Sequence, residues 1–510
     1  MGIYLNPGTI EFQESINSEI YVDKTMLIER TNAALRTKQK YMCISRPRRF
    51  GKSMAVDMLA AYYGKDYDSA ALFDGLEISH CETFSTHLNK YNVFKINMQE
   101  FLSITQNVDE MLKVLQKRLI KELKYNYPEY VDCDNLVFAM QDIFSYTGQS
   151  FIVLIDEWDC LFREYKQDEE AQRKYLDFLR VWLKDKAYIA LAYMTGILPV
   201  KKYGTHSALT EKEVENLCIE YGMSIEETKA WYNGYGLYDH NKQEDILYSI
   251  YNPKSVVEAM LRHRFGNYWN QTETYEALKI YIQMNMDGLK DAIIEMLAGN
   301  SVRINIGTFH NDMTTFATRD DILTLLVHLG YLTYDVEKES VRIPNKEVAQ
   351  EYINAISTMD WKEVISSINN SRKLLEALWN LDSDKVAAGV DKAHEEISIL
   401  QYNDENSLSC TISLAFYFAR EYYTMIRELP TGKGFADICL IPRKIHMDKP
   451  AVIIELKWDK SASGAIAQIK EKKYIDALSE YQGNLLLAGI NYDKKIKKHT
   501  CLIEKVDYKK

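Results

Sequence analysis

Residues 40–63 have the sequence KYMCISRPRRFGKSMAVDMLAAYY, and this stretch decides the fold of the first part of the chain. The apolar run 40–45 ends in a turn and predicts a short strand, whereas the apolar spacing over 52–63 predicts a helix. The same alternation continues along the chain, with strands predicted at 91–98, 151–155 and 187–194 and helices at 107–125 and 173–184. Strands that alternate with helices indicate an α/β domain with a mainly parallel sheet.

The loop in this stretch has the residues expected of a phosphate-binding loop. Gly51, Lys52 and Ser53 match the end of the consensus G-x-x-x-x-G-K-[ST], and Arg46 replaces its first glycine. Backbone N–H groups and a helix N-terminus favour a phosphate, the lysine reaches the β- and γ-phosphates, and the hydroxyl binds Mg²⁺. The sequence therefore predicts nucleotide binding, while Arg46 and Pro47 alter the loop and make hydrolysis a separate question.

An acidic pair ends the apolar strand FIVLI at 151–155. Asp156 is placed to hold Mg²⁺ through water, and Glu157 is placed to polarise the attacking water. The alternative is an acidic pair that only caps a strand. The two motifs lie about 100 residues apart, in the right order and on predicted parallel strands, which favours a nucleotide site. Thr195, at the end of the next strand, either senses the γ-phosphate or merely ends the strand.

The pattern changes after the first 200 residues. Residues 210–357 are mostly helical, and the segment 320–344 predicts helix, strand, turn and strand, which is the outline of a winged helix. Helices continue to about residue 393. An α/β pattern follows, with helices predicted at 407–422 and 465–478 and strands at 435–441, 451–456 and 483–490. We expect four parts: a P-loop domain over 1–208, a helical and winged-helix region over 209–357, a helical connector over 358–395, and an α/β domain over 396–510.

A second set of chemical residues lies in GFADICLIP (434–442) and AVIIELKWDK (451–460). Glu455 and Lys457 are two residues apart on a predicted strand, so their side chains share a face. Asp437 lies beside them if the two strands pair. Two carboxylates then hold one or two Mg²⁺, and Lys457 positions or activates a water or stabilises phosphorane charge. The alternatives are a surface hairpin with an ordinary Glu–Lys pair and a fold that has lost its metal, but an acid within VIIEL usually has a task or a partner.

The composition is that of an ordinary globular protein, with 46% hydrophobic and 26% charged residues. The longest apolar stretch, 187–200, is shorter than the roughly 18 residues of a membrane span, and the N-terminus lacks a signal pattern, so we expect a cytoplasmic protein. Eight cysteines without a CxxC pair predict buried reduced thiols.

The net charge is −11, yet residues 431–510 hold 16 Lys or Arg against 10 Asp or Glu. Either this basic part alone meets a polyanion, or its extra lysines are merely solvated.

Several motifs of this chain resemble those of bacterial AAA-ATPase-like proteins that carry a C-terminal PD-(D/E)XK nuclease-like domain. They are YVDKT (21–25), RPRRFGKS (46–53), LIDEWD (154–159), WYNGY (231–235) and YNPKSV (251–256). The resemblance covers nearly the whole chain. It implies an α/β fold: a P-loop NTPase domain with a parallel sheet, then a helical and winged-helix region, then an α/β nuclease-like domain. One departure is the stretch 197–209, which is shorter than expected for this family.

The motifs and the resemblance together name the candidate site residues. The nucleotide-binding residues are Arg46, Arg49, Gly51, Lys52, Ser53, Asp156 and Thr195. The catalytic residues are Glu157, Asp437, Glu455 and Lys457, and the metal ligands are Ser53, Asp156, Glu405, Asp437 and Glu455. Glu405 matches the family's upstream acidic position, and Gln468 and Tyr474 lie where such enzymes often contact phosphate or metal. The implied cofactors are ATP and Mg²⁺, and the implied partner of the C-terminal domain is nucleic acid, with DNA preferred.

Two functions fit these observations. The first is an ATP-regulated, Mg²⁺-dependent nuclease in which the nucleotide state governs access to the C-terminal site. The second is a non-catalytic, STAND-like ATP switch that uses the nuclease fold only for binding. Intact Asp437, Glu455 and Lys457 favour the first, whereas Arg46 favours the second for the ATPase half. The sequence leaves open whether the protein forms a homo-oligomer.

Overall fold

The chain divides into two compact units, the first comprising Met1–Glu273 with Arg303–Val348 and the second Thr274–Val302 with Ala349–Lys510. The segment Thr274–Val302 therefore belongs with the C-terminal part of the chain, although it lies in the middle of the sequence. The computed structural model describes residues 2–165, 168–197, 208–239, 246–269, 274–284, 286–309, 316–359, 361–396, 405–431, 434–472, 474, 478 and 484–506. Within these ranges, no helix has both the length and the apolar character needed to cross a membrane.

A four-stranded parallel sheet forms the centre of the first unit, in the order β1-β4-β3-β2. Its strands are β1 (Tyr41–Ser45), β2 (Asn92–Asn97), β3 (Phe151–Asp156) and β4 (Ile189–Gly196). Every residue of β3 is buried, as expected for a strand with helices on both faces of its sheet. The predicted α/β fold with a parallel sheet is confirmed.

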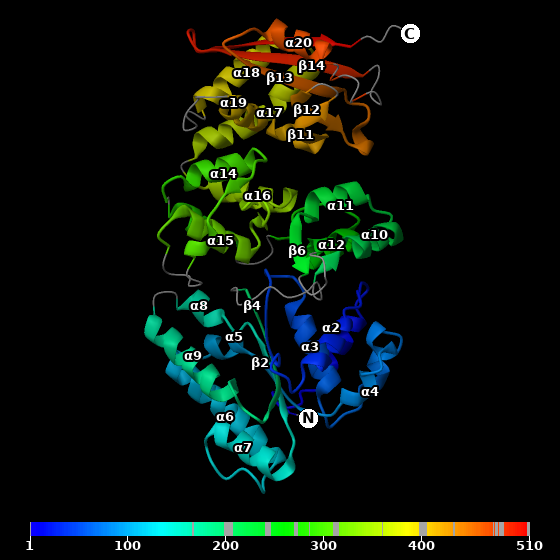
Figure 1. Ribbon diagram of the computed structural model, residues 1–510, viewed down its shortest axis with the longest axis vertical. Coiled ribbons are helices and arrows are strands. Elements are labelled where there is room, and N and C mark those ends of the chain that lie inside the picture. The colour runs from blue at the N-terminus through cyan, green and yellow to red at the C-terminus, as the bar shows by residue number, and fades with distance from the viewer. Residues whose placement is uncertain are drawn as a thin grey trace. The chain divides into compact units, whose positions relative to one another are not determined.

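Helices cover both faces of this sheet (Figure 1). On one side lie α2 (Met26–Ala34) and α3 (Lys52–Tyr63), and on the other lie α6 (Val108–Asn126), α7 (Leu136–Thr147) and α9 (Glu169–Leu183). Apolar residues of α3 share one core with Ile152 and Leu154 of β3. Shorter helices complete the domain: α1 (Ile10–Ile16), α4 (Phe84–His87), α5 (Met98–Ser103) and α8 (Cys160–Glu164).

The rest of the first unit is helical with small sheets. Its helices are α10 (Glu211–Glu220), α11 (Ile225–Tyr232), α12 (Pro253–Arg262) and α15 (Arg319–Leu329). An antiparallel sheet, β5-β7-β6, joins β5 (Leu209–Thr210), β6 (Tyr235–Asp239) and β7 (Ile246–Tyr251). The helical prediction missed this sheet, although its two longer strands, YGLYD and ILYSIY, are rich in the aromatic and branched residues that favour strands.

The predicted order of helix, strand, turn and strand over 320–344 is present. After α15, β9 (Thr333–Asp335) pairs with β10 (Ser340–Arg342) in an antiparallel hairpin. Two capping contacts begin α15, because the Thr318 side chain accepts from the Asp321 N–H and the Asp321 side chain accepts from the Thr318 N–H. α16 (Lys346–Ser357) then leads from the first unit into the second.

A five-stranded mixed sheet forms the centre of the second unit, in the order β11-β12-β13-β14-β15. β13 and β14 are parallel, and the other neighbours are antiparallel. The strands are β11 (Tyr423–Thr431), β12 (Gly434–Pro442), β13 (Ala451–Trp458), β14 (Leu485–Asp493) and β15 (Lys498–Lys505). The helices are α13 (Thr274–Gln283), α14 (Leu289–Leu297), α17 (Lys362–Trp379), α18 (Ser383–Glu396), α19 (Glu405–Ala415) and α20 (Ala462–Glu471).

The helix predicted over 407–422 is too long. α19 ends at Ala415, a 3₁₀ turn occupies Tyr417–Glu421, and β11 begins at Tyr423. Arg420 holds the turn in place, because its guanidinium donates a hydrogen bond of 2.7 Å to the carbonyl oxygen of Leu297 at the end of α14. The aromatic residues that follow Ala415 favour a strand more than a continued helix.

Candidate functional site

The phosphate-binding loop joins β1 to α3 at the carboxyl edge of the parallel sheet. Gly51 has a φ of 72° directly before α3, a conformation that glycine adopts without steric cost. Lys52 is 6% exposed, and its ammonium donates hydrogen bonds to the carbonyl oxygens of Arg46 at 3.2 Å and Pro47 at 3.0 Å. Burial lowers the pKa of Lys52, whereas the neighbouring carboxylates of Glu157, Asp156 and Asp159 raise it.

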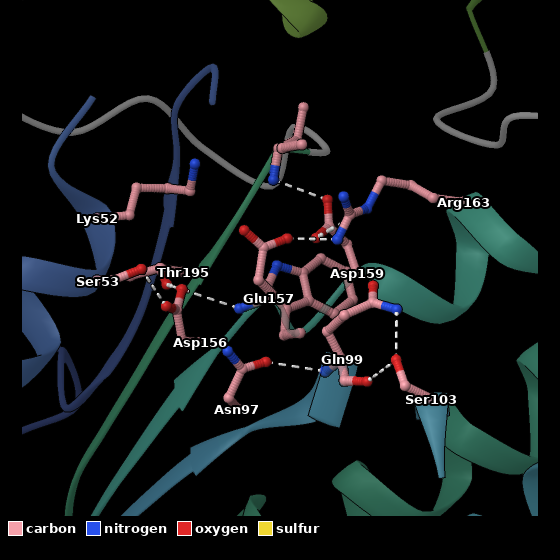
Figure 2. A network of polar contacts seen from close by, with 12 residues as sticks. Lys52, Ser53, Asn97, Gln99, Ser103, Asp156, Glu157, Asp159, Arg163 and Thr195 are labelled. Carbon is pink, nitrogen blue, oxygen red and sulfur yellow. Dashed lines mark hydrogen bonds and ion pairs between the residues drawn. The ribbon is translucent and has the colours of Figure 1, made fainter. Parts of the chain in front are cut away.

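Three of the predicted residues meet at Asp156 (Figure 2). Ser53 Oγ donates to Asp156 Oδ2 at 2.5 Å, and Thr195 Oγ1 donates to Asp156 Oδ1. The backbone N–H of Glu157 also donates to Oδ1, at 2.9 Å. The carboxyl ends of β3 and β4 and the start of α3 bring these groups together, so Thr195 contacts the aspartate directly, a contact that the sequence analysis did not foresee. A hydroxyl beside a carboxylate offers the hard oxygen ligands that Mg²⁺ prefers.

Glu157 is bound by a residue that no sequence motif indicated. The guanidinium of Arg163, on α8, forms an ion pair with the Glu157 carboxylate (Figure 2). Arg163 Nε also lies 3.9 Å from Oδ1 of Asp159, a fully buried acid whose Oδ2 accepts a hydrogen bond of 2.7 Å from the N–H of Ile197. A single arginine on a five-residue helix carries no sequence signal, and only the last residue of LIDEWD pointed to Asp159.

A cavity of about 1260 Å³ opens beside the loop. One part of its wall is polar and charged and includes Arg48, Arg49, Gly51, Lys52, Ser53, Glu157 and Arg163. Another part is apolar and includes Phe12, Ile20, Tyr21, Val22, Pro253 and Val257. Sites for small molecules typically enclose about 300–1,000 Å³. The cavity is therefore large enough for a ligand of the size of a nucleoside triphosphate, and its wall offers both charged and apolar side chains.

The two loop arginines predicted to bind nucleotide have different surroundings. Arg46 is buried and donates a hydrogen bond of 2.9 Å to the carbonyl oxygen of Ser45, and burial lowers its pKa to about 10. Arg49 lines the cavity, but its guanidinium donates a hydrogen bond of 2.6 Å to the carbonyl oxygen of Tyr268. It also lies 5.9 Å from the centroid of the Trp269 ring. Arg46 thus supports the loop from within, whereas Arg49 ties it to the helical region.

Two more loop residues contact the helical region. The Phe50 ring meets the Tyr235 ring edge to face, with centroids 5.4 Å apart. The Tyr235 hydroxyl donates a hydrogen bond of 2.9 Å to the carbonyl oxygen of Gly330, and Gly330 packs closely on Pro47. The phosphate-binding loop is therefore held from outside its own domain as well as by β1 and α3.

We expect Gly330→Ala to lower the stability of the first unit by about 3 kcal/mol. Gly330 has a φ of 86°, which costs an L-residue about 1–2 kcal/mol, and its new Cβ would lie 2.7 Å from Cβ of Pro47. Gly222→Ala is the control, because Gly222 has a φ of 63° but nothing within 4 Å of a new Cβ, so it should lose only about 1 kcal/mol. Thermal unfolding compares the two variants, and equal losses would contradict close packing on the loop.

The second set of predicted residues meets on β12 and β13. The antiparallel register places Ile438 opposite Ile454, so Asp437 and Glu455 lie on neighbouring strands. Asp437 Oδ2 accepts a hydrogen bond of 2.6 Å from the N–H of Leu456, and Lys457 Nζ donates one of 2.8 Å to Glu455 Oε1. The structure thus brings Asp437, Glu455 and Lys457 together on two neighbouring strands.

One carboxylate oxygen of Glu455 has no hydrogen-bond partner among the described residues. Its side chain is buried, and Oε1 accepts from both Lys457 and Gln468. Among the residues described, no donor reaches the buried Oε2. Burial raises the pKa of Glu455, and repulsion by Asp437 adds to the shift, while Lys457 opposes it. A buried carboxylate oxygen without a partner, beside a second carboxylate, fits a divalent cation in this place.

Two further predictions concern this site, and a third concerns a stretch of the first unit. Gln468 on α20 contacts Glu455, and its Nε2 lies 3.5 Å from the Tyr474 hydroxyl, so both residues belong to the site. Glu405 is the first residue of α19, and its side chain lies outside the described residues. The prediction of a shortened stretch at 197–209 falls largely on residues 198–207, which also lie outside the described ranges.

Comparison with known proteins assigns both domains. Residues 7–205 match a family described as "Predicted AAA-ATPase", and residues 404–500 match the "PD-(D/E)XK nuclease superfamily". An Azotobacter chroococcum mcd 1 protein described as "Uncharacterized protein in vnfD 5'region" is 23% identical over 404 residues, which cover 70% of each chain.

Two solved structures also resemble the chain. The Walker-type ATPase of Pyrococcus abyssi is 14% identical with a TM-score of 0.33, and the match covers 64% of this chain and 94% of that one. The ORC2 protein of Aeropyrum pernix, in ADPNP–ADP complexes, is 11% identical with a TM-score of 0.29 over 67% and 96% of the two chains. The family matches thus assign an AAA-ATPase-like domain to residues 7–205 and a domain of the PD-(D/E)XK nuclease superfamily to residues 404–500.

Proposed function

We propose that the first unit binds and hydrolyses ATP and that the C-terminal domain cleaves phosphodiester bonds of nucleic acid, preferably DNA, with ATP controlling access to that site. The observation that carries the nuclease half is the unpartnered, buried oxygen of Glu455 next to Asp437. The ATPase half is supported by the contacts around Asp156 at the edge of a large cavity. We further propose that α15 and the β9–β10 hairpin are the core of a winged helix.

In the ATPase half, each residue has a task that its position supports. Lys52 would release its hydrogen bonds to the carbonyl oxygens of Arg46 and Pro47 and would donate to phosphate oxygens instead. Ser53 and Asp156 would hold Mg²⁺, which supplies charge neutralisation for the phosphates when it is bound. Glu157 would orient water for attack on the γ-phosphate, and the apolar part of the cavity wall would receive the base.

We expect Lys52→Ala to weaken nucleotide binding by about tenfold or more. The substitution removes a cation aimed at the phosphates, and a hydrogen bond to a charged group contributes about 1.5–3 kcal/mol. Calorimetry with a non-hydrolysable ATP analogue and Mg²⁺ measures the change. Lys117→Ala is the control, because Lys117 is exposed on α6 outside the cavity lining. Equal affinity in wild type and Lys52→Ala would remove Lys52 from the site.

In the nuclease half, Asp437 and Glu455 would hold a divalent cation, which supplies Lewis acidity at the scissile phosphate when it is bound. Lys457 would give up its contact with Glu455 Oε1 in part, and would position the attacking water or stabilise the charge that develops on phosphorus. Gln468 would keep the Glu455 carboxylate oriented. The excess of Lys and Arg over residues 431–510 would attract the backbone of the nucleic acid.

The direct test is a cleavage assay with the full chain. Single- and double-stranded DNA and RNA are incubated with Mg²⁺ or Mn²⁺, with and without ATP. We expect metal-dependent cleavage of DNA whose rate changes with ATP. If wild-type protein with ATP and Mn²⁺ neither binds nor cuts any of these substrates, the nuclease proposal is wrong.

A second candidate, an ATP-binding switch without turnover, is favoured by one observation. Glu157, the proposed base, is engaged by Arg163 rather than turned freely to the cavity. Steady ATP turnover by purified protein would exclude this candidate, whereas tight nucleotide binding with no phosphate release would support it.

A further inference from the structure

The pair formed by Glu157 and Arg163 is more than a surface salt bridge. The side chain of Arg163 is 9% exposed and that of Glu157 is 22% exposed. Both residues line the cavity that also contains Lys52 and Ser53. Glu157 has a φ of 53°, a backbone conformation that is unfavourable for any residue with a Cβ and that persists only where the surroundings enforce it. The carboxylate that is best placed for water activation is therefore held in a defined, occupied position.

Arg163 has a second acidic neighbour that is not yet in hydrogen-bond contact. Its Nε lies 3.9 Å from Asp159 Oδ1, beyond hydrogen-bond range. In the part of the chain that the structure describes, this buried Nε–H has no hydrogen-bond partner. Asp159 itself is fixed, since its Oδ2 accepts from the N–H of Ile197 at 2.7 Å. A shift of the guanidinium by about 1 Å would bring Nε to the roughly 2.9 Å of an ordinary hydrogen bond with Asp159.

We propose that Arg163 is a positioning residue with two partners, and that its exchange from Glu157 to Asp159 releases Glu157 to orient water. In the resting state the guanidinium binds Glu157, as observed. In the working state it binds Asp159, and the Glu157 carboxylate faces the cavity. This inference rests on the proposed hydrolysis of ATP at the same site.

The exchange is energetically accessible because no buried charge loses its partner. Breaking a buried ion pair is ordinarily strongly destabilising, since one charge is left uncompensated. Here Arg163 would keep a carboxylate partner, and the partly exposed Glu157 would be solvated in the cavity. The negative charge of a triphosphate next to Lys52 and Ser53 repels the carboxylate of Glu157 from its resting position, so a bound nucleotide weakens the resting pair. A switch that responds to nucleotide follows from this arrangement of two acids around one arginine.

Two substitutions distinguish this role from a structural one, because they should change turnover in opposite directions. Arg163→Gln frees Glu157, so kcat for ATP should rise several-fold with KM little changed. Asp159→Asn removes the second charged partner but keeps an oxygen for the Ile197 N–H, so Arg163 stays on Glu157 and kcat should fall several-fold. The double variant should behave like Arg163→Gln, and Arg163→Lys should restore low turnover. Arg180→Gln is the control, because Arg180 is 64% exposed on α9.

If Arg163→Gln lowers kcat as Asp159→Asn does, while wild type turns over ATP, the inference is wrong and the proposed ATPase stands. If wild type binds nucleotide without turnover, the ATPase proposal fails. The exchange of partners is then tested separately, by the melting temperatures of wild type and variants with and without nucleotide. A double-mutant cycle of Glu157→Gln and Arg163→Gln should show coupling without nucleotide, and the coupling should vanish with Mg²⁺ and a non-hydrolysable ATP analogue. Unchanged coupling in the presence of the analogue would overturn the exchange of partners.

Discussion

Glu157→Gln is expected to lower ATP turnover at least about 100-fold and to leave nucleotide affinity within about twofold of wild type. A general base contributes about 10²–10⁴-fold to a rate, and an amide cannot take its place. Affinity should persist because the proposed phosphate contacts come from Lys52, Ser53 and the loop backbone, not from Glu157. The protein should still fold, because the freed guanidinium of Arg163 has Asp159 as a second partner. Phosphate release and calorimetry on the same preparations measure the two effects.

Glu164→Gln is the matched control for this experiment. Glu164 also lines the cavity and is only seven residues further along the chain, but its side chain is exposed and it lies at the end of α8. Turnover should be unchanged in this variant. If both substitutions reduce turnover equally, the loss reflects the overall negative charge of the cavity wall and not a base at Glu157.

The sequence predicted those parts of the two sites that a local pattern defines. The helix over 52–63 begins and ends where expected, because a glycine, a lysine and a serine follow an apolar strand there. Glu455 and Lys457 were placed together because side chains two residues apart on a strand share a face, and Asp437 was placed beside them on the condition that the two strands pair. In both cases the residues that matter are close to one another in the sequence, or lie on strands whose pairing the pattern implies.

The contacts that the sequence could not predict join residues far apart in the chain. Arg49 contacts Tyr268, and Gly330 packs on Pro47, although more than 200 residues separate the members of each pair. No periodicity or spacing specifies such contacts, because they depend on how the helical region packs on the loop. β11 and β15 were missed for a different reason, since each mixes charged residues into a strand that only the finished sheet identifies.

Asp437→Asn is expected to reduce cleavage of nucleic acid at least about 100-fold and to leave binding equal to or slightly tighter than that of wild type. The variant removes one of two carboxylates proposed to hold the metal, and asparagine can still accept the hydrogen bond from the Leu456 N–H, so the sheet should keep its geometry. Binding persists because lysines that displace counterions from the backbone are untouched, and loss of one negative charge favours a polyanion. Asp448→Asn, at an exposed position between β12 and β13, is the control and should cut normally.

Lys457→Ala completes the test, because it separates charge from metal binding. It should also stop cleavage, but it should weaken nucleic-acid binding, since it removes from the site a cation that attracts the phosphate backbone and that pairs with Glu455. A gel assay of cleavage beside salt-titrated binding curves distinguishes the two variants, and excess chelator should reduce wild type to the level of Asp437→Asn. If Asp437→Asn cuts as fast as wild type, then Asp437 holds no catalytic metal, and the unpartnered oxygen of Glu455 needs another explanation.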